Sequence, residues 1–332
     1  MPTLPKALSL TVAAIGTCLL SIPALAQLVP EREYYGINRS IPMTINIPQG
    51  VAGEIQVELL APDASEVARA AAAQGSVDLA GLFPILWTTD APKTLYAQLI
   101  VDDAPIGSAV VLVPMTTPNL AQRSQPQGNL PPRAVFPEVP KGALTYSGLH
   151  AWQDQHVVFS TSLGDIEFRM RPDQAPNTVL NFLDLVKGGY YTDIIFHRII
   201  GSRNGNDPFM AQVGDPTGTG GGGPGRFIDL EPSHLPHDFG VLSMARTGNP
   251  NTNGGQVFIC FSRNGTKFLD TQYCSFAQAI SGADVILKLE KVETGAQDRP
   301  KDPPVLKSAH TVPAPPLAQE AKPLTRPTQT DR

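Results

Sequence analysis

The sequence has little charge, few cysteines and no long hydrophobic run after its first residues, and these shortages exclude whole classes of protein. Charged residues make up 17% of the 332 and the formal net charge is −5, so no basic patch is available to bind nucleic acid. No stretch beyond the N-terminus is long and apolar enough to span a membrane. Hydrophobic residues nevertheless reach 42%, which is ample for well-packed cores and, at this length, for about two domains.

Residues 1–26 have the pattern of a secretory signal peptide. Lys6 supplies a positive charge, residues 7–22 form an apolar run, and residues 24–26 give a small-x-small cleavage site. The apolar run is too short for a membrane span. We therefore expect a mature chain that begins at Gln27 and is exported, either to the periplasm or out of the cell. Loss of Lys6 makes its formal charge one unit more negative.

Export would place the remaining cysteines in an oxidising compartment. Cys18 leaves with the signal peptide; a lipid anchor on it is the alternative, but Thr17 before it fits a lipoprotein cleavage site poorly. Cys260 and Cys274 could form a disulfide or serve as two small buried apolar residues, and we favour the second interpretation.

Three segments flank the region that carries the chemistry. Residues 27–115 contain short runs of alternating apolar and polar residues, such as 55–59, which predict an all-β accessory domain of the small β-sandwich type. Only Ser65–Gln74, with its alanine run, looks helical there. Residues 116–150 are rich in proline and predict an extended linker, and residues 313–332 predict a disordered, proline-rich tail.

The region between them, residues 151–312, reads as a folded domain of mainly β structure. Residues 156–161 and 165–170 predict two strands joined by a tight turn. Residues 175–186 carry apolar side chains at helical spacing and end at two glycines, so they predict a helix; a second helix is expected near 283–291.

A series of short motifs runs through this region. In chain order they are Ala175–Thr178 with Asn181 and Phe182, Tyr190 with Tyr191, Phe196–Ile200, Phe209–Gln212, Gly214–Gly220, Gly223–Gly225, Leu242–Thr247, Pro250–Ile259, Phe268–Asp270 and Tyr273. In this order and spacing the region resembles the cyclophilin family of peptidyl-prolyl cis-trans isomerases. The resemblance implies a closed eight-stranded antiparallel barrel with a helix over each open end, and isomerase activity on X-Pro bonds without a cofactor.

The chemistry of proline isomerisation explains which residue types such a site needs. The barrier of about 18–20 kcal/mol arises because amide resonance is lost when the bond twists. No nucleophile or metal is required: the site must hold the proline ring in an apolar pocket and donate a hydrogen bond that strengthens as resonance is lost. Arg198 is the candidate donor, because its guanidinium stays charged and presents a rigid fork of N–H groups.

The resemblance assigns the remaining roles. Gln212 and Tyr273 complete the catalytic set with Arg198. The substrate-binding residues are Phe209, Met210, Ala245, Arg246, Thr247, Gln256, Phe258, Phe268 and Leu269. Partners would be proline-containing polypeptides.

The sequence departs from well-known eukaryotic members of the family at several of these positions. Phe268, Tyr273 and Arg246 stand where those members carry Trp, His and Asn, and the same choices resemble bacterial members. The loss of the tryptophan predicts that the inhibitor cyclosporin binds weakly. Residues 201–208, which include Arg203, are longer than the link usual in the family and are expected beside the pocket, where they could change substrate access.

Two other motifs predict no site. Residues 218–225 are glycine-rich, but no Gly-Lys-Ser/Thr follows, so a phosphate-binding loop is not predicted. His234 and His237 have a ligand-like spacing, but Pro236 between them breaks any helix that would present both to a metal, so we interpret the segment as a loop.

Two functional alternatives to an enzyme remain open. One is a peptide-binding or chaperone module that has the cyclophilin-like fold but little turnover. The other places the main role in the N-terminal β domain, as a docking module.

Overall fold

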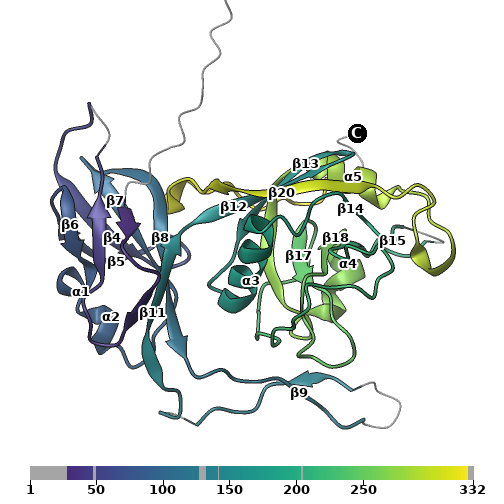
Figure 1. The fold of residues 1–332 in the computed structure, drawn as a ribbon, viewed down its shortest axis with the longest axis horizontal. Helices are drawn as coiled ribbons and strands as arrows, with labels where there is room; N and C mark the ends of the chain where they lie inside the picture. Colours follow the sequence, from purple (N-terminus) through teal and green to yellow (C-terminus); the bar gives the residue numbers. More distant parts are fainter. Residues whose placement is uncertain (1–27, 48–49, 127–131, 141, 203–204, 328–332) are drawn as a thin grey trace, which may run out of the picture.

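The computed structural model describes residues 28–47, 50–126, 132–140, 142–202 and 205–327 (Figure 1). The predicted signal peptide and Arg203 lie outside the described residues. The prediction of a mainly β protein is confirmed, because strands dominate both halves of the chain. None of the helices in the described part is long and apolar enough to cross a membrane.

The N-terminal unit consists of two antiparallel sheets. The larger sheet has the spatial order β2 (Tyr34–Gly36), β11 (Tyr146–Gln153), β8 (Ala104–Thr116), β7 (Leu95–Val101), β4 (Ile55–Leu60) and β5 (Glu66–Ala71). The smaller sheet has the order β1 (Leu28–Pro30), β3 (Pro42–Ile45) and β6 (Gly75–Asp78), and the short helices α1 (Leu79–Leu82) and α2 (Ile85–Thr88) follow it.

One apolar core joins the two sheets. Met43 and Ile45 of the smaller sheet are fully buried in the same cluster as Leu59, Leu99 and Leu112 of the larger one. These strands alternate buried and partly exposed residues, as expected when one face of each sheet packs against the other. The arrangement is the sandwich that the alternation predicted.

The helix predicted over Ser65–Gln74 is wrong. Residues 66–71 form β5, which pairs antiparallel with β4 at the edge of the larger sheet. Arg69 on β5 forms an ion pair with Glu58 across the strands. Alanine favours a helix only weakly, so a hydrogen-bonding partner strand overrides that preference.

The extended linker predicted over residues 116–150 is wrong in its last part and in its middle, which form strands. Its last residues belong to β11, which lies between β2 and β8 and so completes the N-terminal sheet. Its middle contains β9 (Gln122–Arg123) and β10 (Ala134–Val135), which pair antiparallel. We call residues 117–140, apart from the undescribed 127–131, the arm; Figure 1 shows it running alongside the C-terminal unit. Short stretches like these gain their order from partners far away in the sequence, which local patterns do not reveal.

The C-terminal unit is one nine-stranded antiparallel sheet with helices packed on it. Its spatial order is β14 (Ile194–Ile195), β20 (Val305–Pro313), β12 (Gln155–Thr161), β13 (Gly164–Met170), β19 (Ser275–Ser281), β17 (Val241–Met244), β18 (Val257–Cys260), β16 (Met210–Val213) and β15 (Arg198–Ile200). Helices α3 (Pro176–Lys187) and α5 (Ala283–Glu290) are confirmed close to their predicted bounds, and α4 (Arg263–Thr266) with the 3-10 turns η1 (Lys267–Leu269) and η2 (Ala296–Asp298) lies in the loops.

The sheet curls around an apolar core, but the closed eight-stranded barrel is not confirmed. The two edge strands, β14 and β15, are separated only by Phe196 and His197, so the sheet must curl far enough to bring its edges together. Within the described residues, however, no ladder of hydrogen bonds pairs β14 with β15. Phe182 of α3 and Ile286 of α5 are buried in the core that the sheet encloses.

The tail predicted to be disordered is ordered as far as residue 327. It contains the 3-10 turn η3 (Leu317–Gln319), and Leu317 is buried against the larger N-terminal sheet. Leu324 then donates its backbone N–H to Ala279, and Arg326 forms an ion pair with Glu290 of α5. Figure 1 shows the C-terminal segment after β20 reaching toward the N-terminal unit. Apolar and charged anchors spaced along a proline-rich segment are enough to dock it.

Candidate active site

Two of the three predicted catalytic residues, Arg198 and Gln212, lie in one row with the predicted substrate-binding Phe258 across the outer face of the curled sheet. Arg198 on β15 is the direct partner of Gln212 on β16, which is in turn the partner of Phe258 on β18. Paired residues in antiparallel strands project from the same face of a sheet. Their chain neighbours Ile199 and Ala211 point the other way and are fully buried in the enclosed core. The period-two alternation of the strands thus separates the core face from a face that can receive a ligand.

An apolar cluster lies beside this row. Its members among the predicted substrate-binding residues are Phe209, Met210, Ala245, Phe258 and Leu269, with the predicted catalytic Tyr273 against them.

Two aromatic contacts define the limits of this apolar cluster. Phe268, which is 65% exposed, stacks on Phe209 with ring centroids 5.6 Å apart. Tyr273 meets Phe258 edge-on at 6.0 Å. The structure therefore brings the predicted apolar residues together in one cluster, with Phe268 at its exposed rim.

Polar groups are arranged along the other side of the row. Gln212 donates from Nε2 to Oε1 of Gln256 at 2.8 Å, and Gln256 donates in turn to the carbonyl oxygens of Gly220 and Gly222. The guanidinium of Arg198 is 44% exposed and lies 3.5 Å from Asp298. Arg198 is thus both tethered and open to a ligand.

Asp215 organises the glycine-rich loop that contacts Gln256, a role that the sequence analysis missed. Burial alone would raise the pKa of Asp215, but hydrogen bonds from the Gly222 and Thr217 groups and from the backbone of Gly220 outweigh it and lower the pKa. The carboxylate therefore stays charged and holds the loop against the site. The signal was present as an aspartate followed by alternating threonine and glycine.

His237 supports the pocket from behind. It is fully buried, its ring stacks on Phe258 at 6.2 Å, and its two nitrogens contact Asp270 at 3.1 Å and Ser243 at 3.0 Å. Burial lowers the pKa of His237 despite the contact with Asp270, which favours the neutral ring. His234 and His237 lie in a loop, as predicted, and His237 serves in packing. Among the described residues, no group of three His, Cys, Asp or Glu is placed to hold a metal.

Arg246 and its neighbours form the far end of the site. Arg246 donates to the carbonyl oxygens of Gln272 and Thr247, and its guanidinium lies 4.3 Å from the centre of the Tyr273 ring. Burial lowers the pKa of Arg246 from its usual high value, and the side chain remains a cation at neutral pH. A cavity of about 210 Å³ is bounded by Arg246, Thr247, Gln256 and the glycine-rich loop.

The link over residues 201–208, which is longer than usual in the family, connects two strands that are paired at its two ends. Phe209 donates its backbone N–H to Ile200 at 2.9 Å, so the strands on either side remain paired. The hydroxyl of Ser262 donates to the carbonyl of Pro208 at 2.8 Å. The segment therefore ends directly beside the apolar cluster.

The two described cysteines form no disulfide, and Cys260 belongs to the apolar cluster beside the row. Cys260 and Cys274 are buried and free, which confirms the interpretation of two small apolar residues. Burial raises the pKa of Cys274 to about 12, so its thiol stays protonated.

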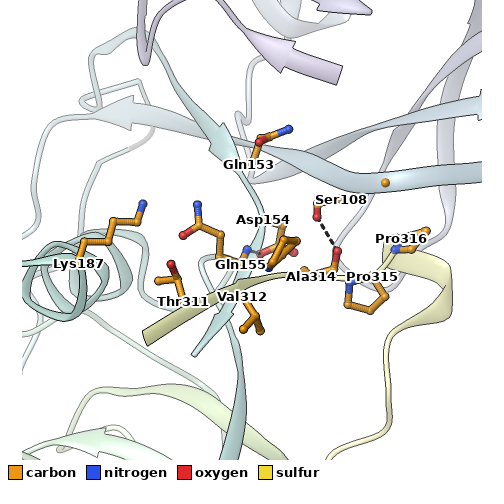
Figure 2. A pocket seen from close by; sticks show the side chains of 12 residues that line it. Ser108, Gln153, Asp154, Gln155, Lys187, Thr311, Val312, Ala314, Pro315 and Pro316 are labelled. Carbon is orange, nitrogen blue, oxygen red and sulfur yellow. Dashed lines mark hydrogen bonds between the residues drawn. The ribbon is translucent and has the colours of Figure 1, made fainter. Parts of the chain in front are cut away.

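A larger cavity lies at the junction of the two units and contains none of the predicted site residues. It measures about 580 Å³ and its lining includes Gln153, Asp154, Lys187 and Pro315 (Figure 2). Across it the hydroxyl of Ser108 donates to the carbonyl of Ala314 on the C-terminal segment.

Comparisons with known proteins match the half of the chain that holds the row and the pocket. The family model described as "Cyclophilin type peptidyl-prolyl cis-trans isomerase/CLD" matches residues 156–311. "Peptidyl-prolyl cis-trans isomerase-like 1" of Aspergillus fumigatus is 44% identical over 151 residues, which are 44% of this chain and 88% of that protein. "Peptidyl-prolyl cis-trans isomerase-like 3" of Dictyostelium discoideum is 41% identical, over 49% of this chain and 99% of its own length.

Among solved structures, a cyclophilin-type peptidyl-prolyl cis-trans isomerase of Cryptosporidium parvum, crystallised in the presence of the dipeptide Ala-Pro, is 37% identical with a TM-score of 0.43. The alignment covers 47% of this chain and 98% of that one.

Proposed function

The chain belongs to the cyclophilin-type peptidyl-prolyl cis-trans isomerase family, and we propose that it accelerates X-Pro isomerisation in exported polypeptides with Arg198 as the catalytic donor. The observation that carries this proposal is the row Arg198–Gln212–Phe258, which places a guanidinium, an amide and an apolar wall side by side on one face of the sheet.

In this proposal the proline ring sits against the apolar wall. Met210, Phe258 and Leu269 are almost fully buried and offer a rigid surface, while the partly buried Phe209 closes one side. Such a wall binds the ring in its cis, trans and twisted states alike. It therefore supplies binding and position, and the acceleration must come from a group that interacts more strongly with the twisted state.

Arg198 is that group. As the amide twists, the prolyl nitrogen becomes pyramidal and basic, and the guanidinium can donate to it and to the preceding carbonyl. Asp298 tethers one terminal nitrogen of Arg198 and so limits the orientations that the side chain must lose on binding. Gln212 fixes the neighbouring peptide group, the backbone of Ala245–Thr247 pairs with the client strand, and the hydroxyl of Tyr273 reaches a client carbonyl.

The exported context rests on the first residues alone. Residues 1–26 carry the charge, apolar run and small-x-small motif of a signal peptide. Mass spectrometry of the secreted or periplasmic protein should give an N-terminus at Gln27. An intact Met1 on the protein recovered from the producing cell would refute export by this route.

The test of the catalytic assignment is Arg198→Ala. Loss of one preorganised donor should lower kcat/KM on an Ala-Pro peptide by about 10²–10³, with KM changed much less. Arg39→Ala is the matched control, because Arg39 is an exposed arginine in the N-terminal unit. Circular dichroism and thermal unfolding should be unchanged in both variants.

The same measurements separate the isomerase from the peptide-binding module. A folded Arg198→Ala protein with near-wild-type turnover would overturn the role of Arg198. A wild-type protein that binds proline peptides without accelerating isomerisation would favour the chaperone alternative.

A further inference from the structure

The arm from the N-terminal half is fastened to the edge of the candidate active site. The backbone N–H of Ala134 donates to Oε1 of Gln272 at 3.0 Å, and Nε2 of Gln272 donates back to the carbonyl of Ala134 at 3.4 Å. A second contact runs from the side chain of Asn251 to the carbonyl of Ala121 at 3.0 Å. Ala121 and Ala134 are both buried against the core of the C-terminal unit. The arm therefore packs on that unit through two polar and two apolar anchors.

Gln272 connects the arm to Arg246. Its side chain is held by Ala134, and its own carbonyl accepts from Nε and Nη2 of Arg246 at 3.2 and 2.7 Å. The next residue, Tyr273, provides the ring on which the guanidinium rests. The position of Arg246 thus depends on a peptide group that the arm holds in place.

Arg246 is left with the means to bind an anion. A guanidinium has five N–H groups, and three of those of Arg246 donate within the protein, to Gln272 twice and to Thr247 once. One N–H on each terminal nitrogen remains, and both can donate to a carboxylate. In the described part of the chain, no Asp or Glu forms an ion pair with Arg246, and its side chain borders the 210 Å³ cavity.

We propose that the arm, acting through Gln272, positions Arg246 as a specificity-determining residue that favours clients with a carboxylate side chain on the N-terminal side of the X-Pro bond. The arm lies before residue 156, where the family match begins, so it is an addition of this chain to the family domain. The proposal rests on the proposed isomerase function and adds a substrate class to it. Gln272 is a positioning residue, and Arg246 touches the substrate.

The expected effect is modest, because the site is open to solvent. An exposed charge pair changes an equilibrium by a few-fold, and salt weakens it. Two peptides that differ only by Glu or Gln two residues before the proline should therefore differ about three- to fivefold in kcat/KM, through KM. At about 1 M salt, where the screening length is about 3 Å, the preference should approach unity.

The experiment compares this Glu-to-Gln preference across variants of the full mature chain. Arg246→Gln should abolish the preference. Gln272→Ala and, from the arm side, Ala134→Pro should each reduce it by at least half; the second variant removes the N–H donor and changes no residue of the C-terminal unit. Lys267→Ala is the control, since it removes an exposed cation one residue before Phe268 and should keep the preference.

Each outcome decides a separate question. Turnover of both peptides without a preference, or a preference that salt does not weaken, would overturn the acidic substrate class. Loss of the preference in Arg246→Gln with full retention in Gln272→Ala and Ala134→Pro would overturn the role of the arm. Absence of turnover on either peptide would instead overturn the proposed function itself.

Discussion

The candidate active site and the junction of the two units both combine apolar side chains with polar or charged ones, but the polar groups are partly exposed at the site and buried at the junction. At the site, an exposed arginine and two partly buried glutamines lie beside an apolar cluster whose rim, at Phe268, is exposed. At the junction, Tyr96, Trp152 and Leu317 form a closed apolar cluster, and charged groups beside it are buried. Polar groups kept near water can exchange partners with a ligand, whereas buried ones are committed to each other. The first arrangement suits turnover and the second suits attachment.

The two regions also differ in how their titratable groups respond to pH. Burial opposes the charge on His156 at the junction, but hydrogen bonds with Glu320 and Glu167 outweigh it and raise the pKa of His156. Burial raises the pKa of Asp154 to about 7. On the site's side, hydrogen bonds and ion pairs overcome burial and lower the pKa values of Asp215 and Asp270.

The largest expected effect is the loss of the buried pair at the junction. His156 and Glu320 contact each other at 3.0 Å with side chains 2% and 4% exposed. Breaking a buried pair by removing one partner costs about 3–5 kcal/mol, and because Glu167 still contacts His156 at 2.8 Å we expect the lower end of this range. Glu320→Ala should therefore lower the free energy of unfolding in urea by about that amount, while turnover of a small peptide by the folded protein changes less than twofold.

Glu293→Ala serves as the matched control for this substitution. Glu293 pairs with Lys301 in an exposed position, so its loss should cost less than about 1 kcal/mol. Equal effects of the two substitutions would show that the C-terminal segment does not hold the junction.

The next largest expected effect is on stability: the contributions of the two regions to the free energy of unfolding should depend on pH with opposite signs. A group with a raised pKa stabilises the fold below its unfolded pKa and loses that contribution as pH rises through the folded value. His156 and Asp154 both follow this direction, and Glu320, Glu167 and Arg169 are the charged groups that face them. The junction should lose about 1–3 kcal/mol between about pH 5 and 8.

Asp215 and Asp270 follow the reverse rule. Their pKa values are lowered, so their contributions are present above the unfolded pKa of about 4 and are lost as pH falls through the folded values. Urea unfolding at several pH values, with Asp154→Asn as a mimic of the protonated acid, tests the difference. In Asp154→Asn the free energy of unfolding should fall less steeply as pH rises above about 5 than it does in wild type. An equal dependence on pH in both proteins would show that Asp154 does not contribute to it.

The same contrast explains what could be predicted from the sequence. The site residues lie in short motifs whose order is specific to a family, so Arg198, Gln212 and the apolar wall were identified and the structure brings them together. The strand alternation of β12 and β13 and the apolar face of α3 were equally local signals.

No local motif or periodicity in the sequence indicated the contacts at the junction. Leu317 is buried only because Trp152, far away in the sequence, forms the surface on which it rests, and Glu320 is ordered by His156. The same holds for the arm, because Ala134 contacts Gln272, which lies 138 residues later in the sequence. A proline-rich composition excludes neither docking nor short strands, as β9, β10 and the docked C-terminal segment show.

The smallest expected effect concerns the exposed rim of the site. The resemblance to cyclophilins implies that the tryptophan usual in the family donates an indole hydrogen bond to cyclosporin, and Phe268 has no N–H to donate. Phe268 is 65% exposed and stacks on Phe209, so the larger indole has room there.

One neutral hydrogen bond contributes about 0.5–1.5 kcal/mol, so Phe268→Trp should tighten cyclosporin binding roughly 3- to 10-fold. Peptide turnover should change less, because proline needs only the apolar wall. Tyr34→Trp is the control, since Tyr34 is a comparably exposed aromatic residue (59%) in the N-terminal unit. Calorimetric titration of the three proteins with the drug gives the answer: tight binding by wild type, or an equal gain in Tyr34→Trp, would show that Phe268 does not occupy the position of the family's tryptophan.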